Sequence, residues 1–370
     1  MTPRAVTGIG VVSAPGVGRA AFFDAMKPGK APSYADGIVE TFDASKYPRA
    51  AVAEVRGFDA TKHLGDKGLR SLDRLTKLLI VAVRQALHDS GLKKDGAWAA
   101  GSADTVGIVV SNAYGSLEAI SELDRVATLE DARYINPSRF PLTVSNSAAG
   151  YASIWEELRA VNVSVSDGNC GALDAAACAD VLLDQERARA ILVGGAEAMS
   201  EALFLGFHKL ADGGVIGEGA ALLALEDTAA AGARGAHVLA EIVGYGTSFA
   251  PPEKESALVH ASAEALEQAI ANALVDASVA PAAVDVVVSG VSGLRAFDEA
   301  ELLAIKRAVR DDVAVLSPKR ALGETLGAGG AMGMLAAIGA FEDRRAKTAL
   351  VTSLGYYGNA SAVVMRAPHH

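Results

Sequence analysis

Short apolar, β-branched runs alternate along this chain with longer alanine-rich stretches. The runs predict strands at Ala5–Ser13, Thr105–Ser111, Val161–Ser166, Ala190–Val193, Ala220–Leu225, Val284–Ser289, Ala314–Leu316 and Ala349–Val351. The alanine-rich stretches predict helices at Leu72–Ser90, Gly115–Arg125, Cys170–Gln185, Ser256–Ala277, Asp298–Val309 and Gly329–Asp343, with a shorter one near Tyr151. This alternation predicts an α/β fold. Because most strands are apolar nearly throughout, we expect a largely parallel sheet covered on both faces.

The two halves of the chain echo one another. Each contains apolar strands, a Gly-rich turn and an alanine-rich helix that follows a strand. This predicts two similar units, residues 1–235 and 236–370, joined by a surface turn at Thr228–Ala236. The chain has 370 residues, of which 51% are apolar and 21% charged, so it can bury a large core.

Charge and cysteine content exclude several classes of protein. The formal net charge is -10 with no Lys/Arg-rich block, which argues against nucleic acid as a partner. No apolar run is long enough to cross a bilayer, and Met1–Gly10 reads directly into a strand, so we expect a cytoplasmic protein with no membrane partner. Two cysteines, Cys170 and Cys178, are too few for a disulfide framework or a four-ligand zinc site.

The candidate chemistry centres on the stretch VSVSDGNCGALDAAACA, from Val163 to Ala179. A strand ends at Ser166, a tight turn follows, and Cys170 begins a helix. Unpaired backbone N–H groups at a helix start favour a thiolate and can stabilise an oxyanion, so Cys170 suits a covalent acyl carrier. A small buried thiol at a crowded turn is the alternative reading. Cys178, two turns further on, is expected in the core.

Seven further segments resemble β-ketoacyl synthases, in the order of that family: AVTGIGVVSAPGVG, RSLDRLTK, NSAAGY, AILVGGAEAMS, VIGEGAALLALED, SPKRALGETLGAGGA and SLGYYGNAS. The resemblance implies the thiolase-like fold, in which two similar halves stack in a five-layer αβαβα sandwich that is usually dimeric. It places the acyl-accepting nucleophile at Cys170, in the N-terminal half. It also implies that the substrate rides on the phosphopantetheine of an acyl carrier protein, with no cofactor or metal held by the chain.

The chain departs from this family at both catalytic histidines, which bind the malonyl thioester and stabilise its enolate. Ser289 replaces the first and Glu324 the second, and none of the seven histidines lies in either motif. Serine stays neutral near pH 7 and an ionised glutamate repels an enolate, so unaided condensation should be very poor. Lys319, which matches the family lysine, could pair with Glu324 and keep it ionised. Otherwise, burial could raise the pKa of Glu324, and the protonated carboxyl could then donate a hydrogen bond. A plain turn residue is the alternative for Glu324. We expect Ser289 and Glu324 to converge on the Cys170 thiol.

Two departures concern the substrate tunnel. The segment HKLADGGVI, between Phe207 and Gly217, and the connection from Arg344 to Leu350 both look shorter than in ordinary condensing enzymes. Tyr356 stands where the family has a gatekeeping phenylalanine, and Leu354 precedes it in the same loop. Tyr356 and Leu354 are therefore the predicted gating residues, and the usual tunnel is in doubt.

The segments CGALDAAACA and SGVSGLRAFDEAELLAIKRAV resemble chain-length factors, the non-condensing partners of type II polyketide ketosynthases. In that branch the histidines are missing and the nucleophile is usually not cysteine. Our first hypothesis is a chain-length-factor-like subunit that forms a heterodimer with a Cys-His-His ketosynthase α subunit, or a homodimer. The second is an atypical synthase or acyltransferase using Cys170, Ser289 and Glu324. The third, a thiolase-type enzyme acting on coenzyme A esters, is disfavoured by the Gly-Glu-Gly-Ala and Asp-Arg-Leu-Thr-Lys signatures.

An acidic acyl carrier protein would need a basic landing patch. The candidates surround the RSLDRLTK helix and are Lys62, Lys67, Arg70, Arg74 and Lys77. A solvated helix face is the alternative interpretation of these charges.

Overall fold

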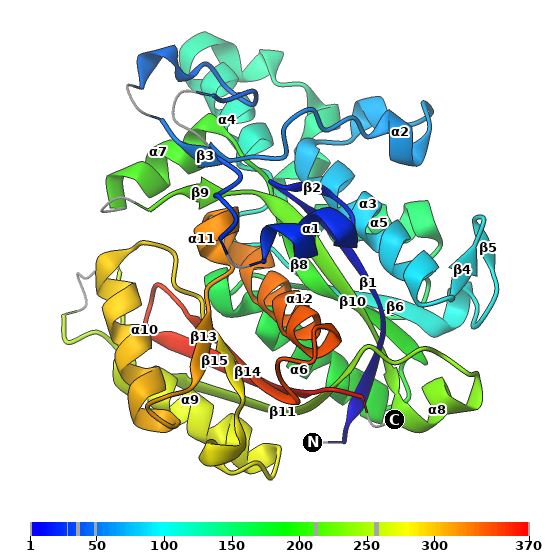
Figure 1. Ribbon diagram of the computed structural model, residues 1–370. Helices are drawn as coiled ribbons and strands as arrows, with labels where there is room; N and C mark the ends of the chain where they lie inside the picture. Colours follow the sequence, from blue (N-terminus) through cyan, green and yellow to red (C-terminus); the bar gives the residue numbers. More distant parts are fainter. Residues whose placement is uncertain are drawn as a thin grey trace.

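The computed structural model describes residues 2–27, 29–34, 38–47, 50–210, 214–254 and 259–368. Eleven strands form its main sheet (Figure 1). Their order is β13 (Ala314–Leu316), β12 (Val286–Val288), β14 (Thr348–Leu354), β15 (Asn359–Arg366), β11 (Ala240–Phe249), β1 (Arg4–Ser13), β10 (Gly219–Asp227), β8 (Ala190–Glu197), β6 (Val106–Ser111) and β7 (Asn162–Val165), with β2 (Gly16–Val17) beside β1.

The sheet repeats one five-strand pattern. In the N-terminal half, β1 and β8 both pair antiparallel with β10, and β6 pairs parallel with β8 and β7. In the C-terminal half, β11, β15, β14, β12 and β13 follow the same order of directions. The repeat confirms the predicted α/β fold with two pseudo-duplicated halves. The predicted largely parallel sheet is wrong, because β10 and β15 run against both of their neighbours.

Glycines in the two equivalent strands β1 and β11 let a helix approach closely. A Cβ on Gly10 would lie 1.9 Å from a carbonyl oxygen of α3 (Arg74–Asp89), and one on Gly246 would lie 2.2 Å from a carbonyl oxygen of α9 (Ala263–Asp276). Glycine is otherwise unfavourable inside a strand, so its presence here reflects backbone packing. In each half, a glycine in the first strand thus lets the covering helix pack closely against that strand.

The helices form three layers (Figure 1). Two are outer layers, one on each half of the sheet, and the third lies between the halves. The helices α3 and α5 (Ser147–Glu156) cover the N-terminal half, and α9 and α10 (Arg295–Ala308) cover the C-terminal half. Between the halves lie α6 (Gly171–Asp184) and α12 (Gly329–Glu342), whose apolar side chains join strands of both halves in one core. This arrangement confirms the five-layer αβαβα sandwich.

Several elements differ from the sequence prediction. The helix expected at Ser256–Ala277 begins at Ala263, and residues 255–258 lie outside the described residues. The strands β11 and β15 were not predicted, nor were the helices α1 (Arg19–Ala25) and α7 (Glu201–Leu210). The expected surface turn at Thr228–Ala236 contains α8 (Thr228–Ala233), which Asp227 caps. The domain boundary predicted after residue 235 stays a prediction. Nowhere in the described ranges does a helix have the length and apolarity needed to cross a membrane.

Candidate functional site

The predicted strand–turn–helix at Cys170 is present. A 3-10 turn, Gly168–Cys170, connects β7 to α6, and Gly168 has the left-handed φ of 52° that glycine tolerates best. The C-terminal half repeats the motif, since the 3-10 turn Leu326–Ala328 leads into α12. The two turns are in contact. The starts of the two central helices therefore meet at the centre of the molecule.

Cys170 is fully buried, and its Sγ lies 3.5 Å from the carbonyl oxygen of Ser353, to which it donates. Burial raises the pKa of the Cys170 thiol well above its ordinary range, and the negative charges of Asp174 and Asp167 raise it further. Desolvation and the two carboxylates thus favour the neutral thiol, so the thiolate expected at this helix start stays a prediction.

Asp174 is a site residue that the sequence reasoning missed. Its Oδ1 accepts hydrogen bonds from the hydroxyls of Tyr245 and Ser361, each at 2.6 Å. Burial raises the pKa of Asp174 to about 7, and a hydrogen bond with Asp167 adds to the shift. An acid of α6 is thus fixed by hydroxyls from β11 and β15 of the other half. The sequence feature that could have identified Asp174 is its position as the single charge in the apolar stretch GALDAAACA.

Glu324 is fully buried and forms an ion pair with Lys319, since its Oε2 lies 2.9 Å from the lysine Nζ. Lys319 is itself only 6% exposed. The other carboxylate oxygen of Glu324 accepts a hydrogen bond from the backbone N–H of Leu326 at 2.9 Å. The predicted pairing of Lys319 with Glu324 is therefore present. Both oxygens are occupied, so this carboxylate offers no donor to a substrate.

Ser289 lies at the end of β12, with its Oγ 2.9 Å from Ser317 Oγ and 3.3 Å from the carbonyl oxygen of Leu316. Together with Lys319 and Ser353 it lines a cavity of about 10 Å³, which is the size of one water molecule. In the part of the chain that the structure describes, no hydrogen bond joins any two of Cys170, Ser289 and Glu324. Ser289 and Glu324 were expected to converge on the Cys170 thiol, and no direct hydrogen bond of this kind is present among the described residues.

Two further buried carboxyl groups surround this region, and the sequence reasoning missed both. Glu197, at the end of β8, accepts hydrogen bonds from the N–H groups of Ala113 at 2.8 Å and Gly327 at 3.3 Å. Burial raises the pKa of Glu197 to about 7, and the charge of Glu324 raises it further. Glu301 accepts from Thr352 at 2.6 Å, and burial raises the pKa of Glu301 to about 6. In the sequence, Glu197 stands out as a charge in the apolar segment AILVGGAEAMS, whereas Glu301 lies among other charges and gives no such signal.

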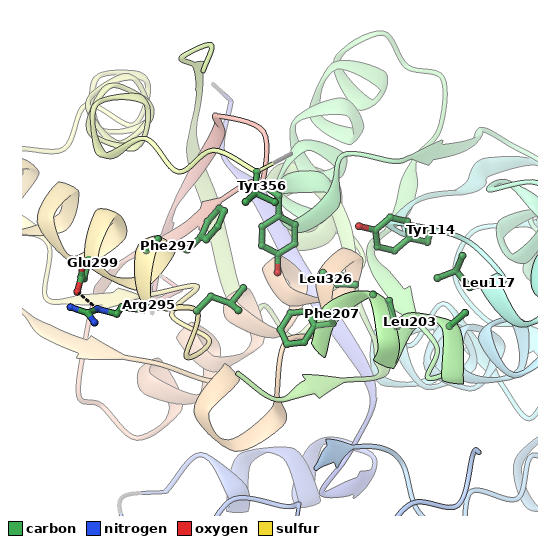
Figure 2. Close-up of a pocket in the computed structure, with 14 residues that line it drawn as sticks. Tyr114, Leu117, Leu203, Phe207, Arg295, Phe297, Glu299, Leu326 and Tyr356 are labelled. Carbon is green, nitrogen blue, oxygen red and sulfur yellow. Dashed lines mark hydrogen bonds and ion pairs between the residues drawn. The ribbon is translucent and has the colours of Figure 1, made fainter. Parts of the chain in front are cut away.

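An apolar pocket of about 650 Å³ lies beside these groups. Its lining includes Tyr114, Leu117, Leu203, Phe207, Leu294, Phe297, Leu326 and Tyr356, and Figure 2 shows the Tyr356 hydroxyl directed toward Leu326. The ring of Tyr356 packs edge-on against Phe297, with centroids 5.0 Å apart. Leu354, the other predicted gating residue, does not line this pocket, because its side chain packs in the outer core under α9. Volume and lining suit an apolar chain.

The Tyr356 hydroxyl is buried although its ring is partly exposed, and it makes no hydrogen bond with a described residue. Burial raises the pKa of Tyr356 well above its usual range, and the nearby charge of Glu324 raises it further. Asn169 and Tyr114 also act on this hydroxyl, and the Oδ1 of Asn169 is buried without a partner among the described residues. Tyr356 therefore separates the apolar pocket from Glu324 and Asn169.

The predicted docking residues do not form a uniform patch. Lys62, Lys67 and Arg70 are exposed and Lys77 is half-buried. The guanidinium of Arg74 instead pairs with the fully buried Glu218, with Nε 2.8 Å from Oε2, and donates to the carbonyl oxygen of Val55 at 2.9 Å. Arg74 is thus held by an internal ion pair. The adjoining groove also carries the acidic side chains Glu40, Asp43, Asp59, Asp66 and Asp73.

The shortened connections are partly described. α7 ends at Leu210 and β9 (Ile216–Gly217) follows, while residues 211–213 of the segment HKLADGGVI lie outside the described residues. β9 pairs with β3 (Val52–Ala53), and the backbone N–H of Gly217 donates to the carbonyl oxygen of Glu324 at 2.7 Å. α12 reaches Glu342 and β14 begins at Thr348, so that connection is short as predicted.

The duplicated five-layer sandwich, with a polar cluster where its two central helices begin, defines a protein of the thiolase-like fold. Two sequence profiles, described as "Beta-ketoacyl synthase, N-terminal domain" and "Beta-ketoacyl synthase, C-terminal domain", match residues 1–210 and 239–350. The chain belongs to the β-ketoacyl synthase family.

Similar proteins fall in both fatty-acid and polyketide branches. The chain is 30% identical to 3-oxoacyl-[acyl-carrier-protein] synthase 2 of Coxiella burnetii, over 92% of this chain and 86% of that protein. It is 29% identical to the actinorhodin polyketide putative beta-ketoacyl synthase 2 of Streptomyces coelicolor, over 94% and 88%. The solved structure "The ishigamide ketosynthase/chain length factor" matches with a TM-score of 0.90 at 21% identity, over 100% of both chains. These likenesses establish a ketosynthase-family protein.

Proposed function

We propose that this chain is a chain-length-factor-like (ketosynthase β) subunit of a type II polyketide, polyene or fatty-acid-like synthase. It pairs with a Cys-His-His ketosynthase in the cytoplasm and helps to elongate acyl chains carried on an acyl carrier protein. It holds no cofactor of its own, because the substrate arrives on the carrier's phosphopantetheine. The polyketide relative from Streptomyces coelicolor and the structural likeness to a ketosynthase/chain length factor support this branch.

The observation that carries the proposal is the ion pair at the position of the second histidine. An enolate needs hydrogen-bond donors, and the loss of one oxyanion donor costs about 100- to 1000-fold in rate. Glu324 has both oxygens engaged, by Lys319 and by the N–H of Leu326, and its negative charge opposes an enolate. Ser289 is turned to Ser317 and Leu316. The two residues at the histidine positions therefore offer no free donor to an enolate.

A partner surface is suggested by the segment that contains α4 (Leu117–Val126) and α5. It exposes several large apolar side chains, at fractions of 74% for Leu129, 70% for Tyr134, 64% for Phe140 and 77% for Ile154. The edge strand β7, at one end of the main sheet, adjoins this segment. Exposed apolar side chains and an open sheet edge both favour association with another chain.

The carrier protein is the third component of the proposal. The name of the Coxiella burnetii relative includes the acyl carrier protein, and such carriers are acidic by our sequence hypothesis. Lys62, Lys67, Arg70 and Lys77 remain the proposed landing residues, since their side chains are exposed or half-buried. Arg74 is no longer proposed, because Glu218 holds it.

The test is co-expression of the tagged chain with a Cys-His-His ketosynthase from the same genome, followed by size-exclusion chromatography. We expect the two chains to elute as one complex. Ile154→Lys and Phe140→Lys should dissociate it, whereas Val275→Lys, at an equally exposed apolar position (79%) on α9, should leave it intact. A complex that all three variants leave intact would contradict the proposed surface, and two chains that never co-elute would contradict the heterodimer.

The alternative function, an acyltransferase based on Cys170 with Ser289 and Glu324, has less support. Its nucleophile is buried with a raised pKa, and its two helper residues hydrogen-bond elsewhere.

A further inference from the structure

The 3-10 turn Gly168–Cys170 directs neighbouring side chains to different sides. Successive residues of a 3-10 helix are about 120° apart around its axis, so Asn169 and Cys170 cannot face the same space. Both residues are buried, with exposures of 4% and 0%. Which of the two faces the substrate pocket therefore decides what chemistry this turn can offer.

The Asn169 side chain lies on the pocket side. Its Nδ2 is 3.4 Å from the carbonyl oxygen of Leu354, in the strand that leads to Tyr356. The polar side chains that act on the Tyr356 hydroxyl include Asn169, Glu324 and Tyr114, and the rings of Tyr356 and Tyr114 line the apolar pocket. The Oδ1 of Asn169 and the hydroxyl of Tyr356 are both buried and both lack a hydrogen bond with any described residue. Asn169 thus acts on a residue of the pocket wall, and each of these two side chains keeps a buried polar atom without a partner among the described residues.

The Cys170 side chain lies on the other side. Its Sγ donates to the carbonyl oxygen of Ser353, and the groups that act on it include Asp174, Asp167 and the hydroxyls of Ser361 and Ser353. The thiol belongs to the cluster of Asp174 between the two sheet halves.

We propose that Asn169, and not Cys170, occupies the acyl-accepting position of this site. A carboxamide nitrogen is a poor nucleophile, because its lone pair is delocalised into the carbonyl, so no thioester or amide forms there. The carboxamide instead offers two N–H donors and one acceptor oxygen. Asn169 would position a carrier-bound acyl thioester through its carbonyl oxygen, with the acyl chain in the apolar pocket. The assignment of Asn169 to this position rests on the proposed non-condensing function. It can nevertheless be tested without a partner protein.

The first experiment uses the purified chain and chloroacetyl-pantetheine, a pantetheine carrying an electrophile, with peptide mass spectrometry. We expect no adduct on Cys170 or Cys178 of the wild type, and complete labelling of residue 169 in Asn169→Cys. The double variant Asn169→Cys/Cys170→Ala should label like Asn169→Cys. A wild-type adduct on Cys170, or labelling of Cys170 instead of residue 169 in the single variant, would overturn the proposal.

The second experiment keeps the proposal testable even if Asn169→Cys does not fold. Binding of butyryl-pantetheine is measured by titration calorimetry for Asn169→Ala and for Cys170→Ala, a pair that removes adjacent buried side chains. Loss of one hydrogen bond should weaken binding about 3- to 10-fold in Asn169→Ala, with no change in Cys170→Ala. The reverse order, or equal losses, would contradict the assignment. Whether a ketosynthase binds the chain affects neither result.

Discussion

The two sides of the turn Gly168–Cys170 differ in how their charges are balanced. On the pocket side, Glu324 is neutralised by Lys319 and hydrogen-bonded by the N–H of Leu326. On the thiol side, Asp174 has hydroxyl partners but no cation among the described residues, and burial raises its pKa to about 7. One side therefore holds a fixed charge pair, and the other holds an acid whose charge changes near neutral pH. Neither arrangement suits condensation, since Glu324 cannot donate to an enolate on the first side and the carboxylates on the second side oppose a thiolate.

The largest expected effect comes from breaking the charge pair on the pocket side. Lys319→Met leaves the buried Glu324 carboxylate without a cation, which should reduce the free energy of unfolding by about 3–5 kcal/mol. The double variant Lys319→Met/Glu324→Gln should recover most of that loss, because it removes the uncompensated charge. Urea unfolding measures both. Arg307→Met, which removes exposed pairs with Glu264 and Glu267, should change stability by less than about 1 kcal/mol. A Lys319→Met variant as stable as Arg307→Met would contradict the account.

A second test concerns the neighbouring proton-binding acid on the pocket side. The pKa of Glu197 is about 7 in the folded protein, against 4.5 for the ordinary group. The folded state therefore binds more protons at this group, so the contribution of Glu197 to stability is fully present below pH 4.5 and is lost as pH rises through about 7. In Glu197→Gln this fall should shrink by up to about 3 kcal/mol. Urea unfolding at several pH values measures it. The exposed control Glu118→Gln should keep the wild-type profile, and equal profiles for all three proteins would refute the prediction.

On the thiol side, Asp174→Asn should make Cys170 more reactive. The substitution removes a negative charge that raises the thiol pKa, and each pKa unit corresponds to a tenfold change in thiolate. We expect alkylation by iodoacetamide to be about tenfold faster at about pH 8, where Asp174 is ionised, and to change less at about pH 6, where it is largely protonated. Cys178 in the same helix is the internal reference. An equal acceleration of Cys178, or the same ratio at both pH values, would show that the substitution merely opens the fold.

The smallest expected effect is a difference in stability between two variants, each of which removes one hydroxyl from one side of the turn. The Tyr356 hydroxyl is buried without a hydrogen bond, so Tyr356→Phe should leave stability unchanged or increase it by about 1 kcal/mol. The Tyr245 hydroxyl donates to Asp174 at 2.6 Å, so Tyr245→Phe should cost about 1–3 kcal/mol. Thermal and urea unfolding of the two variants measure this difference. A loss of stability in Tyr356→Phe equal to that in Tyr245→Phe would remove the distinction between the sides.

The sequence predicted the elements whose signal is continuous. The strand at Ala314–Leu316 and the helix from Gly329 were placed within a residue, because an apolar run and an alanine-rich run define them. The strands β11 and β15 were missed because glycine and serine interrupt their apolar pattern. Those glycines serve the close approach of α9, which is a tertiary contact that no local pattern reveals.

The site was predicted where it depends on short-range spacing. Lys319 begins the short helix α11 (Lys319–Leu322), Glu324 follows its end, and the two side chains do pair. The cluster of Asp174, Tyr245 and Ser361 could not be predicted, because its members come from three distant segments that only the folded sheet brings together. The choice between Asn169 and Cys170 also lay beyond the sequence, since a shift of one residue in a 3-10 turn rotates a side chain by about 120°.

The proposed role depends on whether this chain condenses acyl units when it is alone. The most direct measurement incubates the purified chain with acyl and malonyl carrier proteins and follows elongation by mass spectrometry, with and without a Cys-His-His ketosynthase. The account predicts no elongated product from the chain alone, and product when the ketosynthase is added. Elongation by the chain alone, at a rate comparable to that of the pair, would contradict it.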